Sequence, residues 1–118
     1  NNNFSLLDRG PANTDSVDYP DFAKMVCTDL ADDDANRGIL ICGSGQGMAM
    51  VANKHKGIRA ALCVNEEMVE LARAHNDANV LTIGARLVDE STAISCVDKF
   101  FSTPFEGDRH IKRVNKIG

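Results

Sequence analysis

Residues 38–47 read Gly-Ile-Leu-Ile-Cys-Gly-Ser-Gly-Gln-Gly, and they set the architecture that we expect for this chain. The apolar run at 39–42 is bounded by glycines, a pattern typical of a strand that is covered on both faces. The glycine-rich turn leads into residues 48–54, Met-Ala-Met-Val-Ala-Asn-Lys, which favour a helix. A buried strand, a tight turn and a helix together form the repeating unit of a parallel α/β sheet.

The same alternation continues on both sides of this stretch. Residues 4–8 predict a short strand, and Asp18-Tyr19-Pro20-Asp21 opens a helix, because proline suits the first helical turn. Further strands are predicted at 57–64 and 80–83, and further helices after the cap Asn65, at 89–101 and at 107–117. We therefore expect a single α/β domain over residues 1–118, with a parallel sheet and helices on both faces.

Two of the predicted helices carry a periodic apolar face that we expect to pack on the sheet. These faces comprise Phe22, Val26 and Leu30 in the first helix and Met68, Leu71, Ala72 and His75 in the helix after Asn65. Both sets recur at the three- and four-residue steps that bring side chains onto one side of a helix.

Composition excludes several classes of protein. The 118 residues carry 17 acidic and 13 basic side chains, a net charge of −4, no tryptophan and one tyrosine, which argues against a nucleic-acid partner. No apolar stretch approaches the ~20 residues that a membrane span needs, so no membrane partner is expected. No secretory signal opens the sequence, which predicts a cytoplasmic protein with a small-molecule partner.

The four cysteines are too far apart for a zinc ribbon or a redox pair, since Cys27, Cys42, Cys63 and Cys96 are spaced 15, 21 and 33 residues apart. Without a secretory signal, a disulfide framework is also not expected. Three of the thiols are predicted to be small buried apolar groups. Cys42 differs because it lies at the lip of the glycine-rich turn.

Cys42 and the turn after it form the sharpest candidate site. Glycines at 43, 45 and 47 let the backbone approach a ligand, and the next helix presents free N–H groups to a phosphate or an enediolate oxygen. The turn lacks the patterns of dinucleotide sites, nucleotide phosphate loops and serine nucleophile elbows. A helix N-terminus favours the thiolate of a nearby cysteine, which could take a proton from a carbon beside a carbonyl. The alternatives are a turn that serves packing only and a thiol that is simply buried.

Polar candidates also stand elsewhere. His75 and Asn76 close a helix, where they could move a proton at a sugar oxygen and bind a hydroxyl; the alternative is a packed or capping histidine. Arg109 and Arg113 share one helix face and suit a phosphate dianion, although surface ion pairing is the commoner role of such a pair.

The remaining histidines, His55 and His110, fit no such pattern and are expected at the surface. No cluster of histidine, cysteine and carboxylate residues shows convincing metal-ligand spacing. We therefore expect no metal site and no cofactor.

Several motifs, in order along the chain, resemble ribose-5-phosphate isomerase type B. They are residues 16–23 (Ser-Val-Asp-Tyr-Pro-Asp-Phe-Ala), 39–47 as quoted above, 52–54 (Ala-Asn-Lys), 57–61 (Gly-Ile-Arg-Ala-Ala), 71–81 (Leu-Ala-Arg-Ala-His-Asn-Asp-Ala-Asn-Val-Leu) and 107–114 (Gly-Asp-Arg-His-x-x-Arg-Val). The galactose-6-phosphate isomerase subunits are similar. The resemblance implies a Rossmann-like three-layer sandwich and a homodimer with two shared active sites, with a tetramer formed from two dimers as a further option. It also implies interconversion of D-ribulose 5-phosphate and D-ribose 5-phosphate, through a cis-enediolate, in the pentose phosphate pathway.

The same resemblance implies a role for each candidate residue. Cys42 is implied as the base and Ser44, in place of a family threonine, as a helper at the sugar oxygen; Gly43, Gly45 and Gly47 then belong to the anion hole. His75 is implied in ring opening and Asn76 in hydroxyl binding across the dimer interface. The remaining substrate-binding positions are Arg109 and Arg113 for the phosphate, Arg86 as a weaker candidate, and Tyr19 as a lining residue.

One departure from the family pattern bears on function. Family members usually begin with a strand that ends in Asp-His-x-Gly and a helix, and this sequence opens with Asn1-Asn2-Asn3 and contains no Asp-His pair. We expect the sequence to be a fragment of the molecule; the alternative is a truncated isomerase. The competing functions are an isomerase of another aldose phosphate, such as galactose 6-phosphate or allose 6-phosphate, and a non-catalytic sugar-phosphate-binding module.

Overall fold

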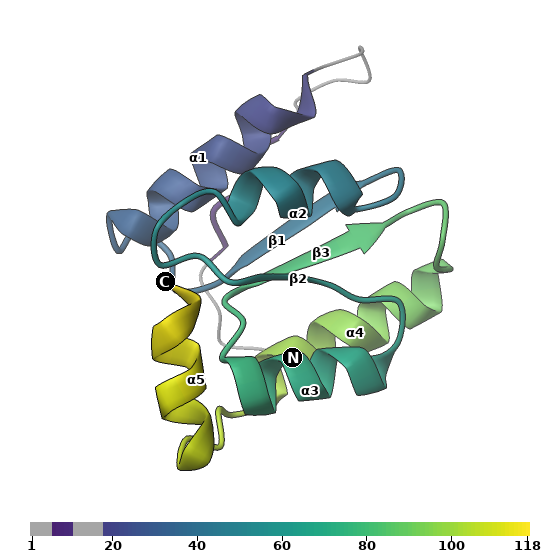
Figure 1. Cartoon of the computed structure of the whole chain (residues 1–118). Coiled ribbons are helices and arrows are strands. Elements are labelled where there is room, and N and C mark those ends of the chain that lie inside the picture. The colour runs from purple at the N-terminus through teal and green to yellow at the C-terminus, as the bar shows by residue number, and fades with distance from the viewer. Residues whose placement is uncertain (1–5, 11–17) are drawn as a thin grey trace.

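The core of the computed structural model, which describes residues 6–10 and 18–118, is a parallel sheet of three strands (Figure 1). The strands are β1 (Gly38–Cys42), β2 (Ala60–Leu62) and β3 (Val80–Gly84), in the spatial order β1-β3-β2. β1 pairs with β3 along its whole length, with Gly38 opposite Val80 and Cys42 opposite Gly84. All five residues of β3 are buried, so the run at 80–84 forms the centre of the described sheet.

Helices cover both faces of the sheet. They are α1 (Tyr19–Ala31), α2 (Gln46–Ala52), α3 (Glu66–Asn76), α4 (Glu90–Ser102) and α5 (Arg109–Ile117). Leu40 and Val80 face α1 and α2 in one apolar cluster, while Leu81 and Ile83 face α3 and α4 in the other. This arrangement confirms the expected Rossmann-like three-layer α/β sandwich. No helix among the described residues is long and apolar enough to cross a membrane.

Two predicted strands differ in detail from the structure. Ile41 in β1 is 58% exposed, so this strand is covered on both faces only along its first part. The strand predicted at 57–64 is shorter in the structure, where only the residues of β2 pair with β3. On its other side, the Asn53 side chain bonds the backbone N–H and C=O of Ala60, at 2.8 and 3.0 Å. Asn79 likewise holds the backbone before β2, where its Oδ1 accepts from Arg59 N at 2.8 Å. Side-chain amides thus replace a further strand as hydrogen-bond partners along this edge.

The strand predicted at residues 4–8 is wrong where it can be compared with the structure. Phe4 and Ser5 lie outside the described residues, and residues 6–8 form no strand. Leu6 is 92% exposed. A strand needs a neighbouring backbone to pair with, and no described strand pairs with these residues.

The helices form where the sequence predicts them, but two predicted apolar faces are misplaced. Asn65 and Asp89 cap α3 and α4 by accepting from the backbone N–H groups of Met68 and Thr92. In α1 the fully buried apolar residues are Ala23 and Cys27, and the predicted face of Phe22, Val26 and Leu30 is half-buried beside them. In α3 the buried residues are Val69, Arg73 and Ala74, whereas the predicted Met68 and Leu71 are 40% and 47% exposed.

Arg73 is the reason that an apolar pattern does not predict the buried face of α3, because a charged residue lies at its centre. Its guanidinium is buried and donates to Asp77 Oδ1 and Ala78 O, each at 2.8 Å, and to Thr103 O at 3.1 Å. These bonds tie the end of α3 to the loop before β3 and to the end of α4. A buried cation is tolerated here because each bond is charge-assisted.

We expect Arg73→Met to lower the free energy of unfolding by about 2–3 kcal/mol, because two carbonyls lose a charged donor in a buried setting. Urea unfolding measures this change. Lys99→Met is the matched control, since Lys99 forms an ion pair at 3.4 Å with the exposed carboxylate of Glu70. Its effect should stay below about 0.5 kcal/mol. Equal losses in the two variants would contradict the role assigned to Arg73.

A second prediction concerns Asp29, a buried carboxylate of α1. Arg9 Nε and Nη2 donate to its two oxygens at 2.7 and 2.6 Å. The hydrogen bond from Arg9, together with the charge of Arg9, lowers the pKa of Asp29 against the opposing effect of burial. A lowered pKa in the folded state means that the pair stabilises the fold above about pH 4 and loses this effect as pH falls through the lowered pKa.

The free energy of unfolding should therefore fall on acidification from about pH 5 to pH 3 more steeply in the parent chain than in Asp29→Asn. Thermal or urea unfolding across this range measures the slope. Asp98→Asn, which removes an exposed carboxylate of α4, serves as the control and should keep the parent slope. If Asp29→Asn keeps that slope too, the ion pair does not contribute to acid sensitivity.

Candidate active site

The thiol of Cys42 lies at the carboxyl end of β1, where the glycine-rich turn begins. The turn folds back over it, so that Gly45 N donates to Cys42 Sγ at 3.2 Å. The next backbone group, Gln46 N, donates to Ser44 Oγ at 3.3 Å. Two successive backbone N–H groups thus donate to the side chains of Cys42 and Ser44, which the sequence predicts to act on the sugar.

The glycines of the turn permit very close packing. Gly45 has φ +78°, a left-handed conformation that favours glycine, and a Cβ there would lie 2.5 Å from Leu62 Cδ1. A Cβ on Gly84, at the end of β3, would lie 2.5 Å from Ser44 O. The turn is therefore fixed against the ends of β2 and β3 with no space for a side chain between them.

Two further candidates border the same turn. A Cβ on Gly47 would lie 2.3 Å from the Tyr19 hydroxyl oxygen, so the Tyr19 ring rests against the turn. A Cβ on Gly43 would lie 3.3 Å from Arg86 Nε, and Arg86 N donates to Gly43 O at 2.9 Å. We call Cys42, the turn at 43–47, Tyr19 and Arg86 the loop half-site.

The other candidates gather elsewhere. His75 and Asn76 form the last turn of α3, and Arg109 and Arg113 are exposed on α5, which contacts α3. Figure 1 shows α5 and the end of α3 at one end of the sheet, while the arrowheads of β1 and β3 point toward the other. We call His75, Asn76, Arg109 and Arg113 the histidine half-site.

The parallel register separates the two half-sites. Cys42 lies opposite Gly84, the last residue of β3, whereas Asn76 precedes the first residue, Val80, by four positions. Four residues of strand span about 13 Å, at about 3.3 Å per residue. One chain therefore presents the two half-sites at opposite ends of its sheet, and the structure does not bring them together.

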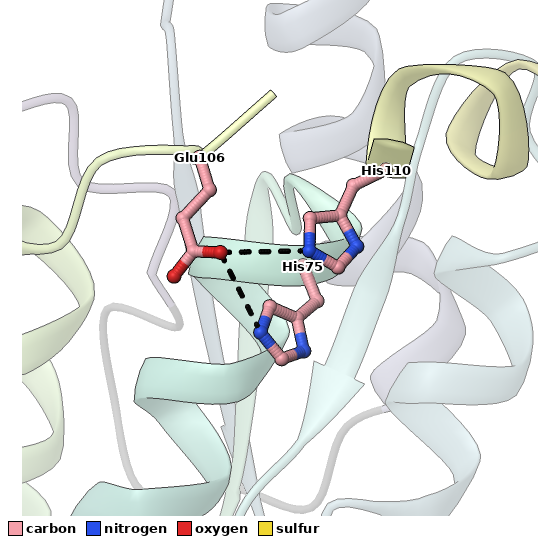
Figure 2. A group of neighbouring side chains, drawn as sticks. All are labelled: His75, Glu106 and His110. Atoms are coloured by element: carbon pink, nitrogen blue, oxygen red, sulfur yellow. Dashed lines mark ion pairs between the residues drawn. The ribbon is translucent and has the colours of Figure 1, made fainter. Parts of the chain in front are cut away.

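The expectation that His110 lies at the surface is wrong. Its side chain is 8% exposed and its ring stacks on that of His75, with centroids 4.3 Å apart (Figure 2). Glu106 completes the group, with Oε1 at 3.8 Å from His75 Nε2 and 3.5 Å from His110 Nε2. The three residues come from three segments of the chain, so their spacing in the sequence does not show that they meet. The spacing of Glu106 and His110, four residues apart, was the available signal.

Ionisation at this group is shaped by its surroundings. Burial lowers the pKa of His110 first, and the positive charges of His75 and Arg109 lower it further, against the opposing effect of Glu106. The imidazole of His110 is therefore held toward its neutral form.

The three other thiols are buried, as predicted. Burial raises the pKa of Cys27 and Cys96, and it raises that of Cys63 to about 11. Cys42 is partly exposed.

A surface cleft of about 570 Å³ lies away from the turn, between the end of α2, the start of β2 and the end of α5. It carries Lys54, Lys56 and Arg59, and among the candidate residues it includes Asn76. Cys42 is not among its lining residues, so the cleft does not by itself form a site around the thiol.

Comparison with known proteins adds an independent finding. A sequence model of the Ribose/Galactose Isomerase family matches residues 1–117. The crystal structure of a ribose 5-phosphate isomerase from Thermotoga maritima is 49% identical, with a TM-score of 0.92, over 94% of this chain and 77% of that one. The ribose-5-phosphate isomerase B of Mycoplasma genitalium, solved with bound ribulose-5-phosphate, is 47% identical, with a TM-score of 0.92, over 97% and 76%. The ribose-5-phosphate isomerase B of Escherichia coli (strain K12) is 40% identical over 95% of this chain and 75% of its own length.

The exposure of the thiols leads to a labelling prediction. Iodoacetamide should modify Cys42 in the folded chain and leave the other three cysteines unmodified, because they are buried. Peptide mass spectrometry locates the label, and labelling in urea should then reach all four. Cys42→Ser is the control and should take up no label when folded. Modification of Cys63 at the rate of Cys42 would contradict the described packing.

Proposed function

The chain belongs to the ribose/galactose isomerase family, and on that basis we propose that it is an aldose–ketose isomerase that interconverts D-ribose 5-phosphate and D-ribulose 5-phosphate. The observation that carries the proposal is the thiol of Cys42, which receives a backbone N–H at the lip of a glycine-rich turn. The names of the similar proteins, and the ribulose-5-phosphate bound to one of them, support the choice of sugar.

Cys42 is the proposed base. Its thiolate takes the proton from C2 of the open-chain aldose and returns it to C1, while the proton of the C2 hydroxyl passes to the C1 oxygen. The intermediate is a cis-enediolate, whose negative charge needs donors that are already in place. The turn at 43–47 supplies backbone N–H groups, and Ser44 supplies a hydroxyl within the same turn.

The histidine half-site is proposed to hold the rest of the substrate. Arg109 and Arg113, four residues apart on an exposed face of α5, offer two guanidinium groups to the phosphate dianion. His75 assists the opening of the sugar ring by proton transfer at an oxygen, and Asn76 donates to a hydroxyl. Tyr19 and Arg86 line the other side, beside the turn.

A second copy of the chain completes the site in this proposal. A pentose phosphate must meet Cys42 and the phosphate-binding arginines together, but one chain holds them at opposite ends of its sheet. Met68 and Leu71 support a homodimer, because this apolar side of α3 is exposed and lies on the helix that carries His75. In a two-fold dimer, the loop half-site of each chain meets the histidine half-site of its partner, which gives two shared sites. A tetramer formed from two such dimers and a cytoplasmic location stay predictions.

Mixed dimers test the reaction and the shared site in one assay. Cys42→Ala and His75→Asn should each lose nearly all turnover of ribose 5-phosphate, since each removes one essential half. Unfolding and refolding the two variants together should restore about a quarter of the parent activity. This is because half of the dimers are then mixed and each has one intact site. The assay follows formation of the ketose.

The controls separate the competing functions. If the site lies within one chain, the mixture stays as inactive as its components. Galactose 6-phosphate and allose 6-phosphate, assayed in parallel with the parent protein, should be poor substrates. Turnover of these sugars alone would move the function to another aldose phosphate. Binding of ribose 5-phosphate without turnover in the parent protein would favour the non-catalytic module.

A further inference from the structure

Three side chains with metal-binding groups converge beside α5. His75 ends α3, Glu106 lies in the segment before α5, and His110 lies in its first turn (Figure 2). The ligand atoms of the three residues all lie within 4.8 Å of one another. Figure 2 shows a nitrogen of each ring paired with the same carboxylate oxygen of Glu106, so both rings present a nitrogen toward this side chain.

The buried nitrogen of His110 is an independent sign that a ligand belongs here. His110 Nε2 is shielded from solvent and has no hydrogen-bond partner, since Glu106 Oε1 at 3.5 Å is too distant. Leaving a buried polar atom unsatisfied costs free energy that a bound group would recover. Glu106 and His75 are both partly open to solvent, so an ion can reach this nitrogen from outside.

We propose that His75, Glu106 and His110 form a binding site for a zinc ion. Two imidazole nitrogens and one carboxylate oxygen are a donor set typical of zinc, with a fourth position left for water. In a tetrahedral site with bonds of about 2.0–2.1 Å, the ligand atoms lie roughly 3.4 Å apart. The observed separations of 3.5 and 3.8 Å from Glu106 Oε1 are close to this value.

The backbone holds the three ligands in place. Glu106 N donates to Ala74 O at 2.9 Å, next to His75, and His110 N donates to Gly107 O at 2.9 Å. The two rings are nearly parallel, with an interplanar angle of 12°, so one ring must turn before both nitrogens aim at one ion. His75 is the more exposed of the two and has the room to turn.

The charges around the site set the expected affinity. Zinc binds the neutral form of imidazole. Glu106 adds a negative charge, while Arg109 and Arg113 on the same helix oppose the binding of a cation. We therefore expect weaker binding than at a structural zinc site.

A bound zinc ion would also stop catalysis, because it would occupy Nε2 of His75. This consequence rests on the proposed function, in which His75 moves a proton. The binding itself does not, and it can be measured in a chain without turnover.

Titration of the metal-free full chain with zinc sulfate alone, by calorimetry after treatment with EDTA, tests the site. We expect one zinc ion per chain. Glu106→Gln should weaken binding roughly 10-fold or more, because the amide is a poor substitute for a carboxylate ligand. Asp108→Asn is the matched control, since it removes the same charge two residues away, and it should keep the parent affinity. Glu106 is exposed, so Glu106→Gln is expected to fold, and circular dichroism verifies this.

Cobalt(II) in place of zinc identifies the donor atoms. Nitrogen and oxygen ligands give visible bands without the strong near-ultraviolet band of a thiolate, and Cys42→Ala should leave the spectrum unchanged. Equal zinc affinity in Glu106→Gln and the parent, or a thiolate band that Cys42→Ala removes, would overturn the site. Zinc binding that is weakened by Glu106→Gln in a chain without turnover would uphold the site and count against the isomerase. In an active enzyme, zinc should inhibit and EDTA should reverse the inhibition; binding without inhibition would retain the site and remove His75 from the proposed mechanism.

Discussion

The parallel pairing of β1 with β3 is the constraint on which the rest of the structure depends. It aligns Cys42 with Gly84, so that the carboxyl ends of both strands form one edge, against which the glycine-rich turn packs. Parallel strands are joined by helical crossovers, and the two crossover helices, α2 and α3, lie on opposite faces of the sheet, with α1 packed beside α2 and α4 beside α3. The same alignment places the end of α3, with His75, at the opposite edge. The pairing of β1 with β3 thus determines both the layered fold and the separation of the two half-sites.

The sequence predicts best what local chemistry decides. The cap Asn65, the helix that starts near Asp89, the glycine-rich turn and the buried strand predicted at 80–83 are all found where the pattern indicates, because each depends on neighbours within a few residues. The Asn53 amide bonds the backbone of Ala60, the first residue of β2, and Asn79 accepts from the backbone of Arg59 just before it; both side chains come from elsewhere in the fold. Such partners carry no periodic signal.

The wrong predictions of the apolar face of α3 and of a surface position for His110 of α5 have a common cause. A periodic apolar face shows that a side of a helix avoids water, but not whether the sheet or another molecule covers it. In our dimer proposal another molecule covers Met68 and Leu71. The buried position on α3 is occupied by Arg73, whose charge is balanced by hydrogen bonds that an apolar pattern does not reveal. His110 looked like a surface residue for the same reason, since only the folding of α5 against α3 buries it.

The packing of the turn has a consequence for how the protein can change over evolutionary time. Positions 45, 47 and 84 have no room for a methyl group, because Leu62, Tyr19 and Ser44 already occupy the space. At 45 and 84 even a substitution to alanine would displace backbone around the thiol, so these two positions tolerate almost no drift, whereas at 47 the Tyr19 ring would have to move. New sugar preferences must therefore arise at the rim, through side chains such as Tyr19 and Arg86, while the floor of the site stays invariant. Related proteins can therefore change which sugar they bind through these rim side chains while the turn that holds Cys42 stays the same.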